Sequence, residues 1–134
     1  MIILENEAKY QQRFGERDKK ANADFCATVV RKKIVNGKKK KVHHDISGNS
    51  LRDVIRTSSL VVGGDINGAL VVLRNVKIKT AYIFYEVVDI EMVGYKVVGV
   101  VQKSEEKYSF TSESLLVYDD KLVFPSNNTK RTQI

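Results

Sequence analysis

Residues 25–46 read FCATVVRKKIVNGKKKKVHHDI, and this stretch decides the fold. Two runs suited to β-strands flank Asn36-Gly37, a pair that tolerates the positive φ angles of a type I′ turn and is the strongest short-range signal of a β-hairpin. The two-residue loop also fixes the register. The expected cross-strand pairs are Val35 with Lys38, Ile34 with Lys39, Lys33 with Lys40, and Lys32 with Lys41.

Basic residues crowd this hairpin. They are Arg31, Lys32, Lys33, Lys38, Lys39, Lys40 and Lys41. Two Lys–Lys pairs stand directly opposite each other, which destabilises the ladder by roughly a few tenths of a kcal/mol. The nearby acids, Asp24 and Asp45, lie at the far end. Because local conflict of this kind is typical of functional sites, we expect the hairpin to bind an anion.

Three other interpretations of the lysines stay open. Lysine protects exposed edge strands from aggregation, and a hairpin is mostly edge. A run of four lysines is also typical of a solvated loop or a localisation signal.

The remaining sequence predicts an α+β fold, with a mainly antiparallel sheet of meanders and hairpins and one or two short helices N-terminal to it. Residues 5–23 are polar and rich in helix formers. Ser50 has the character of a helix N-cap, with Asp53 three residues later, and an apolar helical face continues to about Leu60. Residues 76–88 are apolar on both faces, which indicates a central strand that a bulge or turn could divide.

The chain has 134 residues, the size of one domain. We therefore expect a single domain over 1–134, with a polar and helical segment at 1–23 and a flexible tail at 126–134. The single cysteine, Cys26, cannot form an internal disulfide, and its neighbours suggest a buried packing residue. No sequence segment is apolar enough to span a membrane, so we expect a cytoplasmic protein.

The formal net charge is +7, which favours phosphate-rich partners or acidic surfaces. Nucleic acid, either RNA or DNA, is the leading candidate partner, and an acidic protein is the alternative. In that alternative the chain is a non-catalytic interaction protein or a virion-associated component.

His43 and His44 are the candidate catalytic residues. Adjacent side chains on a strand point to opposite faces, so the two rings cannot share one metal ion, and we expect no metal and no cofactor. One histidine beside a lysine cluster could instead act as general acid or base in a metal-independent ribonuclease, with Asp45 or Glu86 orienting the ring. Whether the chain is an enzyme stays open.

Overall fold

A computed structural model describes residues 2–63, 67–93, 96–103, 106–110, 116–118, 121–123 and 132–133. Two helices lie within these residues, α1 (Glu7–Ala21) and α2 (Leu51–Val62). The strands are β1 (Ile2–Leu4), β2 (Phe25–Val35), β3 (Lys38–Gly48), β4 (Ala69–Asn75), β5 (Thr80–Val93), β6 (Lys96–Lys103), β7 (Glu106–Phe110), β8 (Leu116–Tyr118), β9 (Lys121–Val123) and β10 (Thr132–Gln133).

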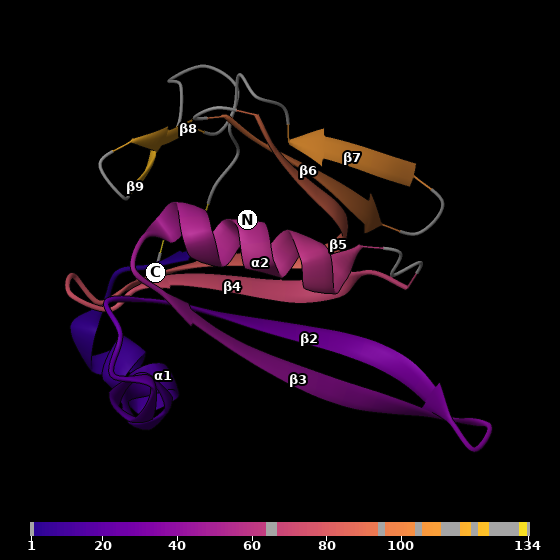
Figure 1. Ribbon diagram of the computed structural model, residues 1–134, viewed down its shortest axis with the longest axis horizontal. Coiled ribbons are helices and arrows are strands. Elements are labelled where there is room, and N and C mark those ends of the chain that lie inside the picture. Colours follow the sequence, from indigo (N-terminus) through magenta and orange to yellow (C-terminus); the bar gives the residue numbers. More distant parts are fainter. Residues whose placement is uncertain are drawn as a thin grey trace.

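The strands form one sheet in the order β3-β2-β4-β5-β6-β8-β9, in which consecutive neighbours are antiparallel. The two helices cover opposite faces of this sheet, and the β2–β3 hairpin extends from its lower edge in the view of Figure 1. The short strand β1 pairs with β5, and β10 pairs with β1 in parallel. The expected α+β fold with a mainly antiparallel sheet is confirmed.

Helix α1 is amphipathic only along a narrow stripe. Asn6 caps its N-terminus by accepting a hydrogen bond from the backbone N–H of Lys9 at 3.1 Å, and Asn22 ends it in the left-handed conformation. Its buried residues are Tyr10, Phe14 and Asp18, spaced four apart on one face. The polar segment predicted at 1–23 is thus one continuous helix preceded by a strand, because β1 buries Ile3 and Leu4.

Helix α2 has a broader apolar face. Ser50 accepts from the backbone N–H of Asp53 at 3.1 Å, which confirms the predicted N-cap. Its buried residues are Leu51, Val54, Ile55, Ser58 and Val62. Burial of each of these Leu, Ile or Val side chains stabilises the folded state by roughly 1.5–3 kcal/mol. The packing of α2 therefore contributes much of the stability on its side of the sheet.

Alternation along β2 divides the core into two clusters. Phe25, Ala27 and Val29 point to the α2 side and join the larger cluster. Cys26 is buried and points to the α1 side, as expected of a packing residue. The smaller cluster there contains Tyr10 and Phe14 of α1.

Two of the expected segments differ in part from the structure. Strand β5 is central, as predicted, with a bulge between Val87 and Asp89, but it begins at Thr80 because residues 76–79 form the turn after β4. The tail expected at 126–134 lies outside the described residues except for Thr132–Gln133, which form β10. Neither helix of the described chain is long and apolar enough to cross a membrane.

Candidate functional site

The β2–β3 hairpin has the predicted geometry. Asn36 and Gly37 have φ angles of 53° and 76°, as a type I′ turn requires. The observed pairs include Val35 with Lys38, Ile34 with Lys39, Lys33 with Lys40, and Lys32 with Lys41. The four predicted pairs are therefore confirmed.

The basic half of the hairpin projects beyond the sheet. Strand β4 pairs with residues 25–30 of β2, and its last contact joins Val30 to Leu70. Residues 31–35 and their partners 38–42 continue past β4 as a two-stranded ribbon, about 17 Å long at 3.3 Å per residue. We call residues 31–42 the basic ribbon (Figure 1).

Both faces of the basic ribbon carry lysines. Cross-strand partners share a face, so Lys32, Lys39 and Lys41 lie on the α1 side with Thr28 and Val30. Lys33, Lys38 and Lys40 lie on the α2 side with Ala27 and Val29. All six lysines are exposed, whereas Arg31, the seventh predicted cation, is partly buried on the α2 side opposite Val42, and its Nε atom is buried.

The lysines have no carboxylate partners in the described part of the chain. Asp24 pairs with Lys77 at 3.3 Å, and Asp45 lies 3.6 Å from the Arg17 guanidinium. Within the described residues none of the six lysines forms an ion pair, so their charges face solvent without a partner.

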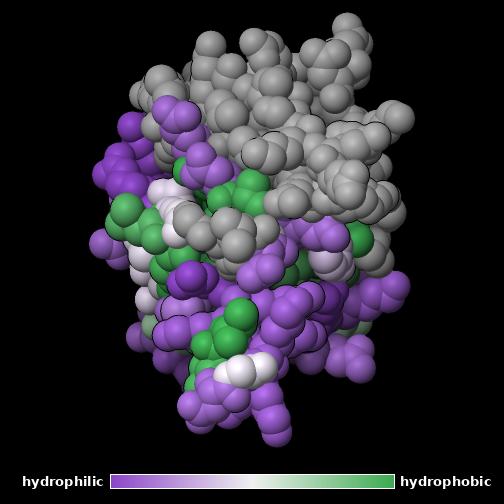
Figure 2. Space-filling model, turned by 90° about the vertical axis from the view of Figure 1, so that its right-hand side faces the viewer, coloured by the Kyte–Doolittle hydropathy of each residue, from purple (hydrophilic) through white to green (hydrophobic). Residues whose placement is uncertain are grey.

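The end of the basic ribbon is not wholly polar. Ile34 is 67% exposed between its lysine neighbours. Figure 2 views the molecule toward the projecting hairpin, where hydrophilic surface surrounds a small hydrophobic area at the bottom of the view. This end therefore carries positive charges together with the exposed apolar side chain of Ile34.

The two histidines point to opposite sides of β3. His43 is exposed on the α1 side opposite Val30, and His44 is partly buried on the α2 side opposite Val29. Asp45 shares the α1 side with His43, whereas Glu86 lies on β5, from which β3 is separated by β2 and β4. The described residues contain no group of three or more His, Cys, Asp or Glu side chains suited to a metal ion.

A groove with a volume of about 1070 Å³ is lined by α1 on one side and by β2, β3 and β4 on the other. Val30 and His43 line it at the end nearest the basic ribbon. Arg13, Arg17 and Lys20 line it from α1. Sequence reasoning missed this groove, although the i, i+4, i+7 spacing of these three cations already placed them on one face of a helix.

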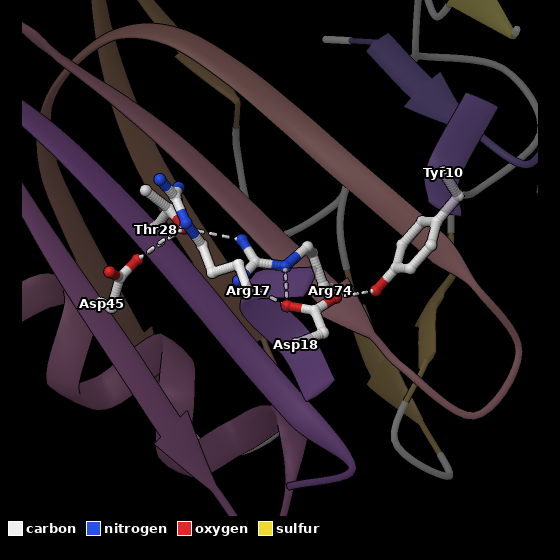
Figure 3. Close-up of polar contacts among 6 residues, drawn as sticks. All are labelled: Tyr10, Arg17, Asp18, Thr28, Asp45 and Arg74. Carbon is white, nitrogen blue, oxygen red and sulfur yellow. Dashed lines mark hydrogen bonds and ion pairs between the residues drawn. The ribbon is translucent and has the colours of Figure 1, made fainter. Parts of the chain in front are cut away.

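A chain of polar contacts leads from Thr28 and Arg74, which line this groove, to the buried Asp18 and Tyr10 (Figure 3). The Arg74 guanidinium contacts Asp18 Oδ1 through Nε and Nη2, both at 2.9 Å, and donates from Nη1 to Thr28 Oγ1 at 2.7 Å. Thr28 Oγ1 donates to Asp45 at 3.2 Å, and the Tyr10 hydroxyl donates to Asp18. Arg74, Asp18 and Tyr10 are almost fully buried, so these contacts hold α1 against the sheet.

Burial changes the chemistry of two groups beside this chain of contacts. The pKa of Tyr10 is raised far above its usual range, first by burial and then by its hydrogen bond to Asp18. Burial likewise raises the pKa of the Cys26 thiol. Cys26 is therefore held as a neutral thiol, which is a poor nucleophile.

The comparisons with known proteins identify no relative. No protein-family model, no curated protein and no solved structure matches the chain.

Proposed function

We propose that the chain binds nucleic acid, gripping its phosphates with the basic ribbon. The observation that carries this proposal is the set of six exposed lysines on a projecting ribbon, without an ion pair in the described part of the chain. A cytoplasmic location accords with the proposal, and the free, buried Cys26 is compatible with a reducing compartment.

Lysine favours a grip on the backbone over the reading of bases. Its ammonium is a point charge on a flexible stem, and phosphate contacts position a protein without carrying sequence information. Lysines on both faces let the ribbon meet phosphates from either side. We therefore expect binding with little sequence preference, to RNA or DNA.

Edge protection explains the lysines less well. Charged side chains do shield an exposed edge. However, lysines alternating with acids would shield it equally and would avoid the repulsion between Lys32 and Lys41 and between Lys33 and Lys40. An anionic ligand removes that repulsion, and this favours a binding role.

A charge-matched pair of variants tests the proposal. In the first, the lysines at 38–41 become Gln. In the second, Lys9, Lys19, Lys77 and Lys121 become Gln, which removes the same number of positive charges from exposed positions elsewhere. We expect the hairpin variant to lose at least tenfold in affinity for a fluorescent oligonucleotide, measured by anisotropy, and the control variant to lose much less.

Equal losses of affinity in the two variants would show that binding depends only on the net charge, and this would overturn the proposal. If the wild-type chain binds no oligonucleotide but retains an acidic protein, the basic ribbon docks on protein instead.

Metal-independent cleavage of RNA is a second candidate, which the position of His43 favours. His43 lines the groove with Asp45 and lies on the same face as Lys41. A proton-transfer group beside a phosphate-binding cation is the arrangement that phosphodiester cleavage needs.

His44 serves as the matched control for this second candidate, because its ring lies on the opposite face. We expect cleavage of total RNA in EDTA to be lost in His43→Ala and kept in His44→Ala. Cleavage that survives in His43→Ala, or its absence from the wild-type protein, would exclude this role.

A further inference from the structure

The groove beneath α1 opens directly onto the basic ribbon. On the α1 side of the hairpin, the pair formed by Val30 and His43 is followed by the pair formed by Lys32 and Lys41. Successive pairs on one face are about 7 Å apart along a strand. Because Val30 and His43 line the groove, a ligand lying on Lys32 and Lys41 reaches it without crossing another element among the described residues.

The wall of the groove suits a phosphate chain. Arg13, Arg17 and Lys20 face the groove from α1. The carboxylates that line it are Glu16 and Asp45, and Asp45 already contacts Arg17 and Thr28. Arg13 and Lys20 are exposed on the same wall, so their charges face a ligand entering from solvent.

The floor of the groove suits a flat, weakly polar group. Val30, Leu70 and Val72 lie side by side on β2 and β4 and all line it. Thr28 adds one hydroxyl, which Arg74 and Asp45 hold in place at 2.7 and 3.2 Å. An apolar floor with a few placed polar groups is typical of sites for small organic ligands, and the volume of about 1070 Å³ exceeds what one nucleotide needs.

The buried contacts of Arg74 fix α1, and with it the wall of this groove, against the sheet. Tyr10 and Phe14 pack one half of α1 on the sheet, and Asp18 fixes the other half through Arg74. The α1 wall of the groove therefore has a fixed position relative to its floor.

We infer that the groove receives an unpaired nucleotide, so that the ligand of the basic ribbon is a single-stranded nucleic acid. The inference rests on the proposed function, because the ribbon delivers the strand. The phosphates lie along Lys32, Lys41 and the α1 wall, and the base lies on the floor beside Val30. In a duplex the bases are stacked and paired, so they cannot enter the groove without being flipped out.

Filling the groove tests this inference. Val30→Phe places a ring on the floor, and Val61→Phe places the same ring on α2, on the opposite side of the sheet and outside both the groove and the basic ribbon. Both positions are partly buried, and neither change alters charge. We expect Val30→Phe to weaken binding of a single-stranded oligonucleotide about tenfold relative to Val61→Phe, with little change for a duplex of the same length.

A second pair of variants changes only exposed residues. Arg13→Gln with Lys20→Gln removes two cations from the groove, and Lys9→Gln with Lys19→Gln removes two from exposed positions of α1 outside it. We expect the first pair to weaken single-strand binding at least threefold more than the second.

The outcomes separate the two proposals. If the groove variants match their controls while the hairpin variant loses binding, the groove inference falls and the proposed function stands. If the hairpin variant binds as well as the wild type, the proposed function falls. Equal affinity of the wild type for single strand and duplex would also overturn the groove inference.

Discussion

Arg74 is the residue that shapes the α1 side of the molecule. Its side chain is 1% exposed, and it joins β4 to Asp18 of α1 and to Thr28 of β2. Its carbon Cζ also lies 4.8 Å from the centroid of the Phe14 ring. A planar guanidinium with several donors in fixed directions satisfies these partners together, which lysine could not do.

Breaking this ion pair is expected to be costly. Asp18→Leu leaves the Arg74 cation buried without its partner, and Arg74→Met does the same to the Asp18 carboxylate. We expect each single change to lower the free energy of unfolding by about 3–5 kcal/mol in urea titrations. We expect the double variant to be more stable than either single variant, and additive losses would contradict this account.

Tyr10 predicts a specific alkaline sensitivity. Its pKa is higher in the folded chain than the ordinary value of 10.0, so the folded state retains the proton that the unfolded state releases. Its contribution to stability is therefore complete below pH 10 and declines as the pH rises above 10. We expect the urea midpoint of the wild type to fall more steeply above pH 10 than that of Tyr10→Phe.

Burial raises the pKa of Cys26 as well, above its ordinary value of 9.0. Its ionisation therefore lowers the stability of both proteins as the pH rises above 9. The difference between the two pH profiles isolates Tyr10. Parallel profiles from pH 9 to 11 would mean that Tyr10 ionises as it does in water.

At the scale of elements, two positions require glycine for different reasons. Gly37 and Gly68 have φ angles of 76° and 77°. A Cβ at Gly37 would meet nothing within 4 Å, whereas a Cβ at Gly68 would lie 2.9 Å from Glu86 Cα in β5. Gly37 is thus required for its conformation alone, and Gly68 for conformation and space.

These surroundings predict unequal costs. We expect Gly37→Ala to destabilise the chain by about 1–2 kcal/mol, the cost of a left-handed conformation for a residue with a Cβ. Gly68→Ala should cost more, because the backbone of β5 must also move. The free energies of unfolding from urea titrations would refute this if the two variants were equal or reversed in order.

The elements that the sequence predicts well depend on local signals. Asn36-Gly37 specifies the turn and its register, and Ser50 with Asp53 specifies the start of α2. The pairing of β1 with β5 was not predictable, because its register, with Ile3 opposite Tyr82, joins distant parts of the chain. The Asp18–Arg74 pair spans 56 residues, so the sequence gives no local sign of it or of the groove that it holds.

At the scale of the whole molecule, basic residues are concentrated on the part of the fold that projects from the sheet. Seven of the 23 lysines and arginines lie within residues 31–41, at the end of the hairpin that projects from the sheet. The sequence predicted this ribbon because it is continuous in the chain. It did not predict the groove, because the groove requires α1, β2, β3 and β4 to be placed together.

The dependence of nucleic-acid affinity on salt tests the central claim most directly. Each phosphate contact contributes about 0.7 to the slope of log K against log salt for a single strand, and about 0.9 for B-form DNA. We expect substitution of the lysines at 38–41 by Gln to reduce the magnitude of that slope by up to about 3. A slope equal to that of the wild type would show that these lysines do not contact phosphates and would contradict the account.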